Sequence, residues 1–283
     1  MTTQVKRPTS KFVVVSNLRV HYLDWGNEAA QPLLMLHGLR GYAQAWDPIA
    51  RDLSDRYHVV AWDARGRGES DWAKDQKYNL ATYVSDLASF IEKLNIQKVI
   101  LMGHSMGGRI GIVYSAQHPL QVAALIIVDI GPTVEAKGDE RIRRELKETP
   151  DEFPSSEAAR AFLKKQLPAL SDRAIEARLT HSLRALPGGK LMWKYDRAIR
   201  EQRLGATAPE NLWPSLRALR CPTLILRGAT SDILSRQTVE AMANVVAGSK
   251  WMEISGAGHL IPEENPKDML AAVRKFLDSL SGK

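Results

Sequence analysis

The sequence predicts an α/β fold, in which a mostly parallel sheet of eight strands carries helices on both faces and a helical lid is inserted. Three observations predict it. Short apolar runs alternate with segments of helical periodicity up to residue 132 and again after residue 213. Between these parts, residues 133–213 contain no strand-like run. A serine flanked by glycines follows one apolar run and opens a helical segment.

The strands are expected in eight runs. The first two surround Asn17 and are typical of an antiparallel hairpin, whereas the later runs are continuously apolar, as in buried parallel sheets. The eight runs lie at residues 11–16, 19–25, 32–36, 57–62, 98–102, 123–128, 223–226 and 251–254. Apolar residues three or four positions apart predict the main helices of this part of the chain. These helices are expected at residues 45–53, 80–94, 108–118, 237–246 and 267–280.

Residues 133–213 have a different character from the rest of the chain. They are charged, rich in helix formers and interrupted by prolines, which predicts about four helices joined by turns. The total length of 283 residues fits one large domain that carries an insertion. We therefore expect a core domain made of residues 1–132 and 214–283, and a helical lid, or cap, made of residues 133–213.

Composition argues against several classes of protein. The net charge of +7 comes from basic residues spread along the chain, which argues against nucleic-acid binding. The single cysteine, Cys221, excludes an internal disulfide and predicts a reduced, cytoplasmic setting. No run approaches the ~18 apolar residues of a membrane span. The histidines lack metal-binding spacing and the glycine-rich loops lack a nucleotide fingerprint, so no metal and no cofactor are expected.

The sequence Gly-His-Ser-Met-Gly at residues 103–107 is the strongest chemical signal in the chain. It joins the strand-like run 98–102 to a helical segment, which is the context of a nucleophile elbow. In such a turn the serine adopts strained backbone angles, and the glycines on either side leave room for the neighbouring chain. We therefore expect the hydroxyl of Ser105 to be presented at the top of the sheet as a nucleophile.

A serine nucleophile needs a base, and the base needs a carboxylate to orient it. His259 follows the last strand-like run in a loop of small residues, so it is the expected base. Asp232 follows the run 223–226 and gives the chain order serine, aspartate, histidine, so it is the expected acid. Asp129, which ends the run 123–128, is the alternative acid. Two backbone amides are expected to hold the oxyanion, those of Leu39 and Met106.

Together these motifs resemble the α/β-hydrolase fold family, in its lidded branch that includes the epoxide hydrolases. The resemblance extends from about residue 11 to residue 280, and the matching segments are residues 37–38, 63–70 and 103–108, Asp232, and residues 258–259. It implies catalytic roles for Ser105, Asp232 and His259, and indicates the machinery better than the substrate. Epoxide hydrolases and haloalkane dehalogenases of this branch use an aspartate nucleophile where this chain has serine, which argues against both chemistries.

The expected function is that of a serine hydrolase acting on a small carboxylic ester, thioester, lactone or related acyl compound through an acyl-serine intermediate. Two alternatives stay open: a hydrolase of carbon–carbon bonds in ring-cleavage products, which needs a cationic pocket, and a ligand receptor with slow turnover. Lid helices can pair in such proteins, so a homodimer is also open.

Several residues are candidates for binding the substrate. Arg40 adjoins the proposed oxyanion donor, from where it could reach a substrate carboxylate. Trp193 and Tyr195 of the lid are candidates for the wall of an acyl pocket. His104 is expected to point away from Ser105.

Overall fold

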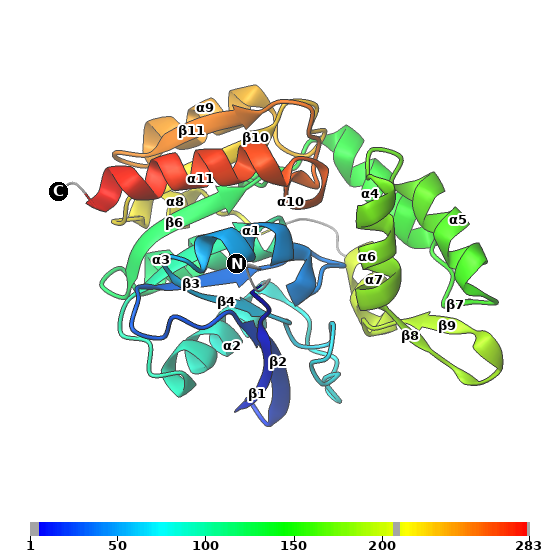
Figure 1. Ribbon diagram of the computed structural model, residues 1–283. Coiled ribbons are helices and arrows are strands. Elements are labelled where there is room, and N and C mark those ends of the chain that lie inside the picture. Colours follow the sequence, from blue (N-terminus) through cyan, green and yellow to red (C-terminus); the bar gives the residue numbers. More distant parts are fainter. Residues whose placement is uncertain (1–5, 206–209, 282–283) are drawn as a thin grey trace, which may run out of the picture.

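The computed structural model describes residues 6–205 and 210–281, and its centre is an eight-stranded sheet. The strand order is β1-β2-β4-β3-β5-β6-β10-β11 (Figure 1). The first two strands, β1 (Thr9–Val15) and β2 (Leu18–Asp24), form the expected antiparallel hairpin, and β2 also runs antiparallel to β4. The other strands are parallel: β3 (Pro32–Leu36), β4 (His58–Trp62), β5 (Val99–His104), β6 (Val122–Val128), β10 (Thr223–Gly228) and β11 (Lys250–Ile254). The predicted fold class is confirmed.

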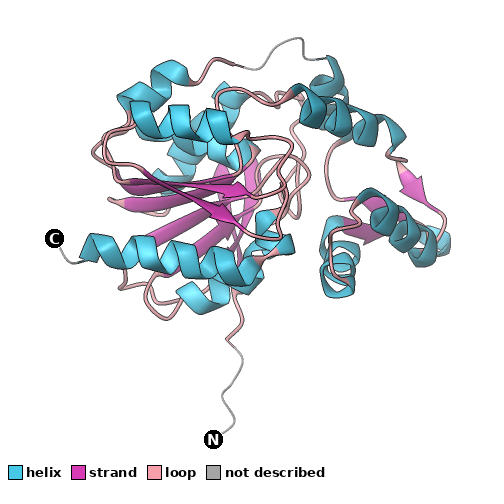
Figure 2. Ribbon diagram, turned by 90° about the horizontal axis from the view of Figure 1, so that it is seen from above, coloured by secondary structure: helices cyan, strands magenta, loops and turns pink. Residues whose placement is uncertain are grey.

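Helices cover both faces of this sheet, as Figure 2 shows from above. Alternate residues of a strand face opposite sides, so Leu33 and Met35 belong to one apolar cluster and Leu34 and Leu36 to the other. Helices α1 (Asp47–Leu53) and α11 (Pro266–Ser281) bury residues in the first cluster. Helices α2 (Leu80–Lys93), α3 (Met106–Gln117), α8 (Trp213–Ala218) and α9 (Arg236–Val245) bury residues in the second.

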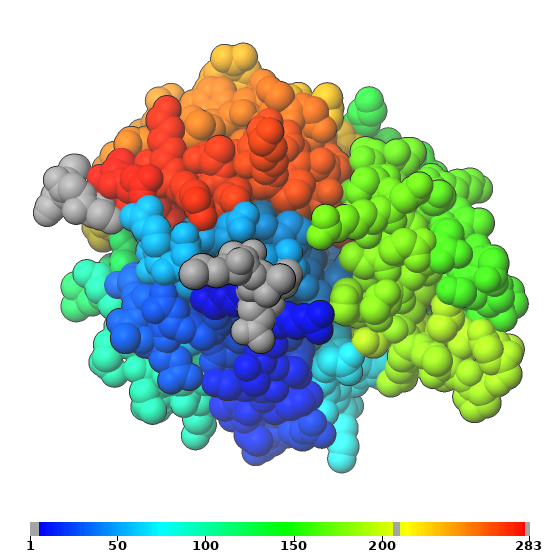
Figure 3. Space-filling view, viewed as in Figure 1, coloured from blue at the N-terminus to red at the C-terminus, as the bar shows by residue number. Residues whose placement is uncertain are grey.

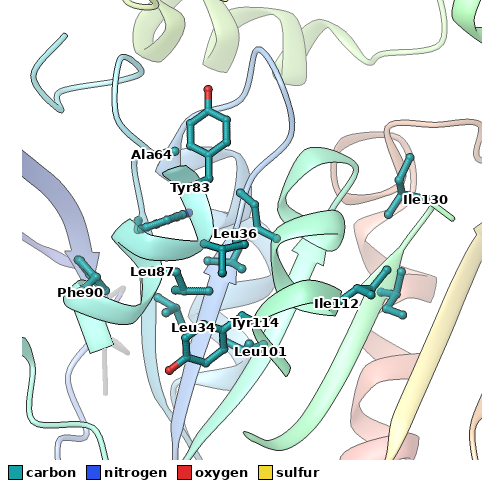
Figure 4. Packing of buried hydrophobic residues seen from close by; sticks show 14 of the residues in the cluster. Leu34, Leu36, Ala64, Tyr83, Leu87, Phe90, Leu101, Ile112, Tyr114 and Ile130 are labelled. Carbon is teal, nitrogen blue, oxygen red and sulfur yellow. The ribbon is translucent and has the colours of Figure 1, made fainter. Parts of the chain in front are cut away.

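The second cluster anchors the helix that follows the serine. Side chains of β3 and α2 lie together in it, among them Leu34, Leu36, Leu87 and Phe90 (Figure 4). Each of these four is fully or almost fully buried, and burying such a side chain stabilises the fold by about 1.5–3 kcal/mol. Ile110 and Ile112 of α3 are buried in the same cluster, so this helix is held against the sheet.

Within residues 133–213, called the cap segment from here on, residues 136–205 lie beside the sheet (Figures 1 and 3). In Figure 2 the arrowheads of the parallel strands point toward this segment. Its helices are α4 (Ala136–Glu148), α5 (Ser156–Gln166), α6 (Asp172–Ser182) and α7 (Arg197–Gly205). The expectation of a strand-free segment was wrong, because β7 (Glu152–Phe153), β8 (Leu183–Ala185) and β9 (Leu191–Trp193) form a small antiparallel sheet. These strands have only two or three residues, too few to show an alternating pattern.

Shorter elements complete the fold: η1 (Ala43–Trp46), η2 (Pro187–Gly189) and α10 (Ile261–Glu264). Over the described ranges, the structure has no helix with the length and apolarity that crossing a membrane requires. Within the same ranges, histidine, cysteine and carboxylate side chains nowhere gather in threes as a metal site would need.

Candidate active site

Ser105 occupies a strained turn between β5 and α3. Its backbone angles are φ 53° and ψ −117°, a region that a residue with a side chain adopts only under tertiary constraint. Neighbouring glycines make the turn feasible. A Cβ on Gly103 would collide with the carbonyl oxygen of Gly107, and a Cβ on Gly107 would collide with that of Leu36. The chain therefore passes through this turn only with glycine on both sides of the serine.

The structure brings Ser105 and His259 together. The Nε2 atom of His259 lies 3.1 Å from Oγ of Ser105, within hydrogen-bond distance. The histidine sits in the loop after β11, at the same sheet edge as the serine turn, because both follow parallel strands.

The carboxylate that contacts His259 is Asp129, which corrects the expectation for Asp232. Nδ1 of His259 donates to Oδ2 of Asp129 at 2.8 Å. Asp129 directly follows β6 with a positive φ of 49° and is completely buried. Its carboxylate also accepts from the backbone N–H of Gly228 at 2.8 Å and from the hydroxyl of Ser231 at 2.6 Å. Both oxygens are thus satisfied, as a buried carboxylate requires.

Asp232 is instead the partner of Arg141 in the cap segment. Nε and Nη2 of Arg141 donate to the two oxygens of Asp232 at 2.6 and 2.8 Å, a bidentate arrangement. These hydrogen bonds hold the pKa of Asp232 below its usual value and raise that of Arg141. Asp232 therefore links the cap segment to the core.

His104 lies beside His259, not away from the serine as expected. Its ring is 4.8 Å from the ring of His259 between centroids, and its Nε2 donates to the backbone carbonyl of His259 at 2.7 Å. Burial, and then the neighbouring His259, lower the pKa of His104 well below its usual value. Neutral His104 therefore holds the backbone of the loop that carries His259, while Asp129 orients the ring of His259.

The loop after β3 carries the first of the two expected oxyanion donors, the backbone amide of Leu39. Nε2 of His37 accepts from the N–H of Ala64 at 3.1 Å, so its Nδ1 carries the proton and donates to the carbonyl of Gly38 at 2.8 Å. Burial lowers the pKa of His37 to about 4, which keeps this tautomer neutral. In a planar trans peptide the N–H points opposite to the C=O, so the N–H of Leu39 points away from the His37 ring.

The other expected amide, that of Met106, opens helix α3. Its N–H belongs to the first turn, where amides have no partner within the helix. Among residues 6–205 and 210–281, neither this amide nor that of Leu39 has an acceptor. Both are therefore free to donate to a ligand.

Arg67 connects the two amide-bearing residues, and sequence reasoning missed it. The side chain is fully buried. Its Nε donates to the carbonyl of Leu39 at 2.7 Å, and its Nη2 contacts Sδ of Met106 at 3.2 Å. Its remaining contacts are the hydroxyl of Tyr83 at 2.9 Å and the carbonyl of Arg65 at 3.0 Å. No carboxylate of the described residues pairs with this guanidinium, so a buried positive charge contacts both of the residues that carry the two amides. Its only sequence signal was a second arginine in the segment 63–70.

A cavity of about 90 Å³ lies next to Ser105 and His259. Core and cap side chains line it together. The apolar ones are Leu39, Ala45, Trp46, Ile142, Leu167, Leu260 and Pro262, and the charged ones are Arg40, Arg141, Glu145, Arg178 and Glu263. Arg40 lines this cavity, and its Nη2 donates to Glu145 at 2.5 Å.

Trp193 and Tyr195 do not line this cavity, so their expected place in the substrate pocket was wrong. Both are buried inside the cap segment, with their ring centroids 5.5 Å apart. Trp193 also packs edge-on against Phe153 and donates from its Nε1 to the carbonyl of Pro150 at 2.9 Å. These rings form the core of the cap segment, because β9 and its flanks turn them inward.

Comparison with known proteins identifies the family of this chain. The family model described as "alpha/beta hydrolase fold" matches residues 31–266. The chain is 30% identical to a 3-hydroxybutyrate-oligomer hydrolase of Cupriavidus necator, with 91% of this chain and 92% of the relative covered. It is 26% identical to the 2-(acetamidomethylene)succinate hydrolase of Mesorhizobium japonicum, with 87% and 88% covered.

A solved structure agrees with these matches. The crystal structure of an E-2-(acetamidomethylene)succinate hydrolase superposes with a TM-score of 0.88 at 26% identity, covering 96% of this chain and 99% of the other. An esterase of Mycobacterium tuberculosis is a further relative, 27% identical over 91% of this chain and 86% of its own. The chain belongs to the α/β-hydrolase fold family and is a hydrolase.

Proposed function

We propose that this protein is a serine hydrolase that cleaves a small carboxylic ester, thioester, lactone or related acyl compound through an acyl-serine intermediate. The observation that carries the proposal is the continuous contact from Ser105 Oγ through the ring of His259 to the buried carboxylate of Asp129. Hydrogen-bonded serine, histidine and aspartate in this arrangement form the catalytic triad of acyl hydrolases on several unrelated folds.

In the first half of the reaction, Oγ of Ser105 attacks the substrate carbonyl while Nε2 of His259 takes the hydroxyl proton. Asp129 keeps the proton of His259 on Nδ1, so that Nε2 is free to act as a base. The bond from Oγ to the carbonyl carbon forms, and the carbonyl oxygen becomes an oxyanion. His259 then gives its proton to the departing group as the bond to that group breaks.

The amides of Leu39 and Met106 are the proposed donors to the oxyanion. Both belong to backbone that other contacts hold in place, so they need no rearrangement when the charge develops. His37 fixes the peptide that carries the Leu39 N–H, and Arg67 contacts both residues. The guanidinium of Arg67 adds positive potential on the side of the oxyanion where water does not reach.

In the second half, a water molecule gives a proton to His259 and attacks the acyl carbon. The bond from the acyl carbon to Oγ of Ser105 breaks, the proton returns to the serine, and the carboxylic acid leaves. We propose that the cap segment forms the lid over this reaction, because α4 and α6 contribute residues to the cavity wall.

The experiment is release of p-nitrophenolate from p-nitrophenyl acetate by the wild type and by Ser105→Ala. The proposal expects kcat to fall at least about 10³-fold in this variant. Ser85→Ala, which changes an exposed serine of α2, is the matched control and is expected to keep wild-type turnover. Activity that survives Ser105→Ala contradicts the proposal.

A second candidate is hydrolysis of a carbon–carbon bond in a carboxylate-bearing diketone or dienoate. The same serine and histidine would act, and the observation that favours it is the presence of Arg40, Arg141 and Arg178 around the cavity. Loss of the ultraviolet absorbance of a 6-oxo-dienoate upon mixing, absent in Ser105→Ala, would support it. The reduced, cytoplasmic setting and the homodimer stay predictions of the sequence.

A further inference from the structure

We propose that the cavity selects acyl substrates that carry a second carboxylate, and that Arg40 binds this carboxylate in competition with Glu145. The proposal rests on the proposed function, because it names the substrate class of the same site. It follows from how the charged side chains of the cavity wall are paired.

Two of the three arginines in the cavity wall already bind a carboxylate through two parallel N–H donors. Nε and Nη2 of Arg178 donate to the two oxygens of Glu263 at 2.8 and 2.5 Å. Arg141 uses Nε and Nη2 for Asp232 and its third nitrogen, Nη1, for Glu145 at 2.6 Å. Each of these two arginines therefore already holds a carboxylate through two parallel hydrogen bonds that compensate its charge.

Arg40 is different from both. A single hydrogen bond, from its Nη2 to Oε2 of Glu145, ties it to the described part of the protein. Its Nε and Nη1 have no acceptor among residues 6–205 and 210–281, and its side chain is 20% exposed. Guanidinium groups bind carboxylates best through two parallel N–H donors, and both such pairs of an arginine include Nη2. Nη2 of Arg40 uses only one of its two hydrogens for Glu145, so one pair remains for a ligand.

The position of Arg40 sets the geometry of such a substrate. It directly follows Leu39, whose amide is proposed to hold the oxyanion, so its backbone lies about 3.8 Å, one Cα–Cα step, from that residue. Arg40 and Ser105 also line the same small cavity, so a carbonyl at Ser105 and a carboxylate at Arg40 would be separated by a short chain. The cavity volume of about 90 Å³ agrees, because roughly 300–1,000 Å³ is usual for pockets that take drug-sized ligands. Such a small cavity favours short acyl groups over long lipid chains.

Glu145 marks the place where an anion is stable. This carboxylate is 4% exposed, yet it lines the cavity and is held by Arg40 and Arg141 together. Burying a carboxylate that deep destabilises the fold unless cations compensate its charge. The two arginines therefore create a site of positive potential that Glu145 fills in the free protein. A substrate carboxylate would compete with Glu145 for Arg40.

Two esters of nearly equal shape test the charge alone. Monomethyl succinate carries the second carboxylate, and methyl 4-oxopentanoate has a neutral ketone in its place. The rate of methanol release from each gives kcat/KM at pH 7.5. The wild type is expected to prefer monomethyl succinate by at least about tenfold, a typical gain for one charge-assisted hydrogen-bond pair.

Two variants should then change this preference in opposite directions. Arg40→Gln is expected to lower kcat/KM for monomethyl succinate at least about tenfold more than for the ketone ester. Glu145→Gln removes the internal competitor and is expected to raise the preference for the anionic ester. The matched control is Arg160→Gln, which changes an exposed arginine of α5 that pairs with Glu176, and should leave the ratio unchanged.

Three results would overturn the proposal: a wild type without preference for the anionic ester, equal losses on both esters in Arg40→Gln, or a Glu145→Gln variant whose preference falls. If p-nitrophenyl acetate is hydrolysed but neither methyl ester is, the proposed substrate class is also wrong while the serine mechanism stands. If p-nitrophenyl acetate itself is not hydrolysed, the proposed function has failed instead.

Discussion

Asp129 and His259 are 130 positions apart in the chain, yet a hydrogen bond of 2.8 Å joins Oδ2 of Asp129 to Nδ1 of His259. The contact follows from the order of the parallel strands. Asp129 directly follows β6 and His259 lies in the loop after β11, and both strands flank β10. A Cβ at Gly228, the last residue of β10, would collide with the carbonyl oxygen of Gly258. Glycine at this position therefore lets the histidine loop cross the end of β10 and reach Asp129.

The two aspartates should respond differently to the same substitution. Asp129→Asn replaces the acceptor of the His259 N–H and favours the wrong tautomer, so kcat should fall on the order of 10³–10⁴-fold. Asp232→Asn weakens a partly exposed pair with Arg141 and should change kcat by less than about fivefold. The measurement is p-nitrophenyl acetate turnover for both variants, with folding checked by circular dichroism. A larger loss in Asp232→Asn than in Asp129→Asn would restore the acid that the sequence suggested.

His37 should make the protein less stable in mild acid. Its pKa is about 4 in the folded chain because it is buried, against a usual value of 6.5. Between these values the unfolded chain binds the extra proton and the folded chain does not. The stabilising effect of the neutral ring is therefore complete above pH 6.5 and is lost as the pH falls toward 4. A shift of this size corresponds to about 3 kcal/mol of unfolding free energy.

Urea unfolding of the wild type and of His37→Asn between pH 7 and pH 4 tests this effect. The variant has no titrating group at this position. Between pH 7 and pH 4 its unfolding free energy should therefore fall by about 3 kcal/mol less than that of the wild type. Parallel curves for the two proteins would show that His37 titrates normally in the folded state.

Arg67 should matter for turnover more than for substrate binding. Arg67→Met removes the donor to the Leu39 carbonyl and the positive charge that contacts Leu39 and Met106. We expect kcat for p-nitrophenyl acetate to fall about 10²-fold with little change in KM, because the loss falls on the transition state. Arg67→Lys keeps the charge and should recover part of kcat. Equal activity of the methionine and lysine variants, measured where both are folded, would argue that the charge has no part in the reaction.

The sequence predicted the sheet and the serine turn because both leave strong local patterns. Continuous apolar runs identified the parallel strands, and the glycines around Ser105 are required by close backbone contacts inside the turn. His259 was identifiable for a similar reason, since a loop of small residues after the last strand precedes it.

The choice between Asp129 and Asp232 could not be made from local pattern. Both residues follow neighbouring parallel strands, so both carboxylates come to the same edge of the sheet. Arg141 of the cap segment decides which of them is engaged elsewhere, and its position depends on how α4 packs over the core. Trp193 and Tyr195 were misplaced for the same reason, because the sequence showed aromatic residues but not which side of the cap segment they face.

The most direct test of the account is covalent labelling with diethyl p-nitrophenyl phosphate, followed by intact-protein mass spectrometry and peptide mapping. The phosphoryl group reacts as an acyl carbonyl would, but its serine adduct hydrolyses slowly. The account predicts one diethylphosphoryl group per chain, located on Ser105, with release of one equivalent of p-nitrophenolate and much slower labelling in Asp129→Asn. Labelling at another residue, or undiminished labelling of Ser105→Ala, would contradict it.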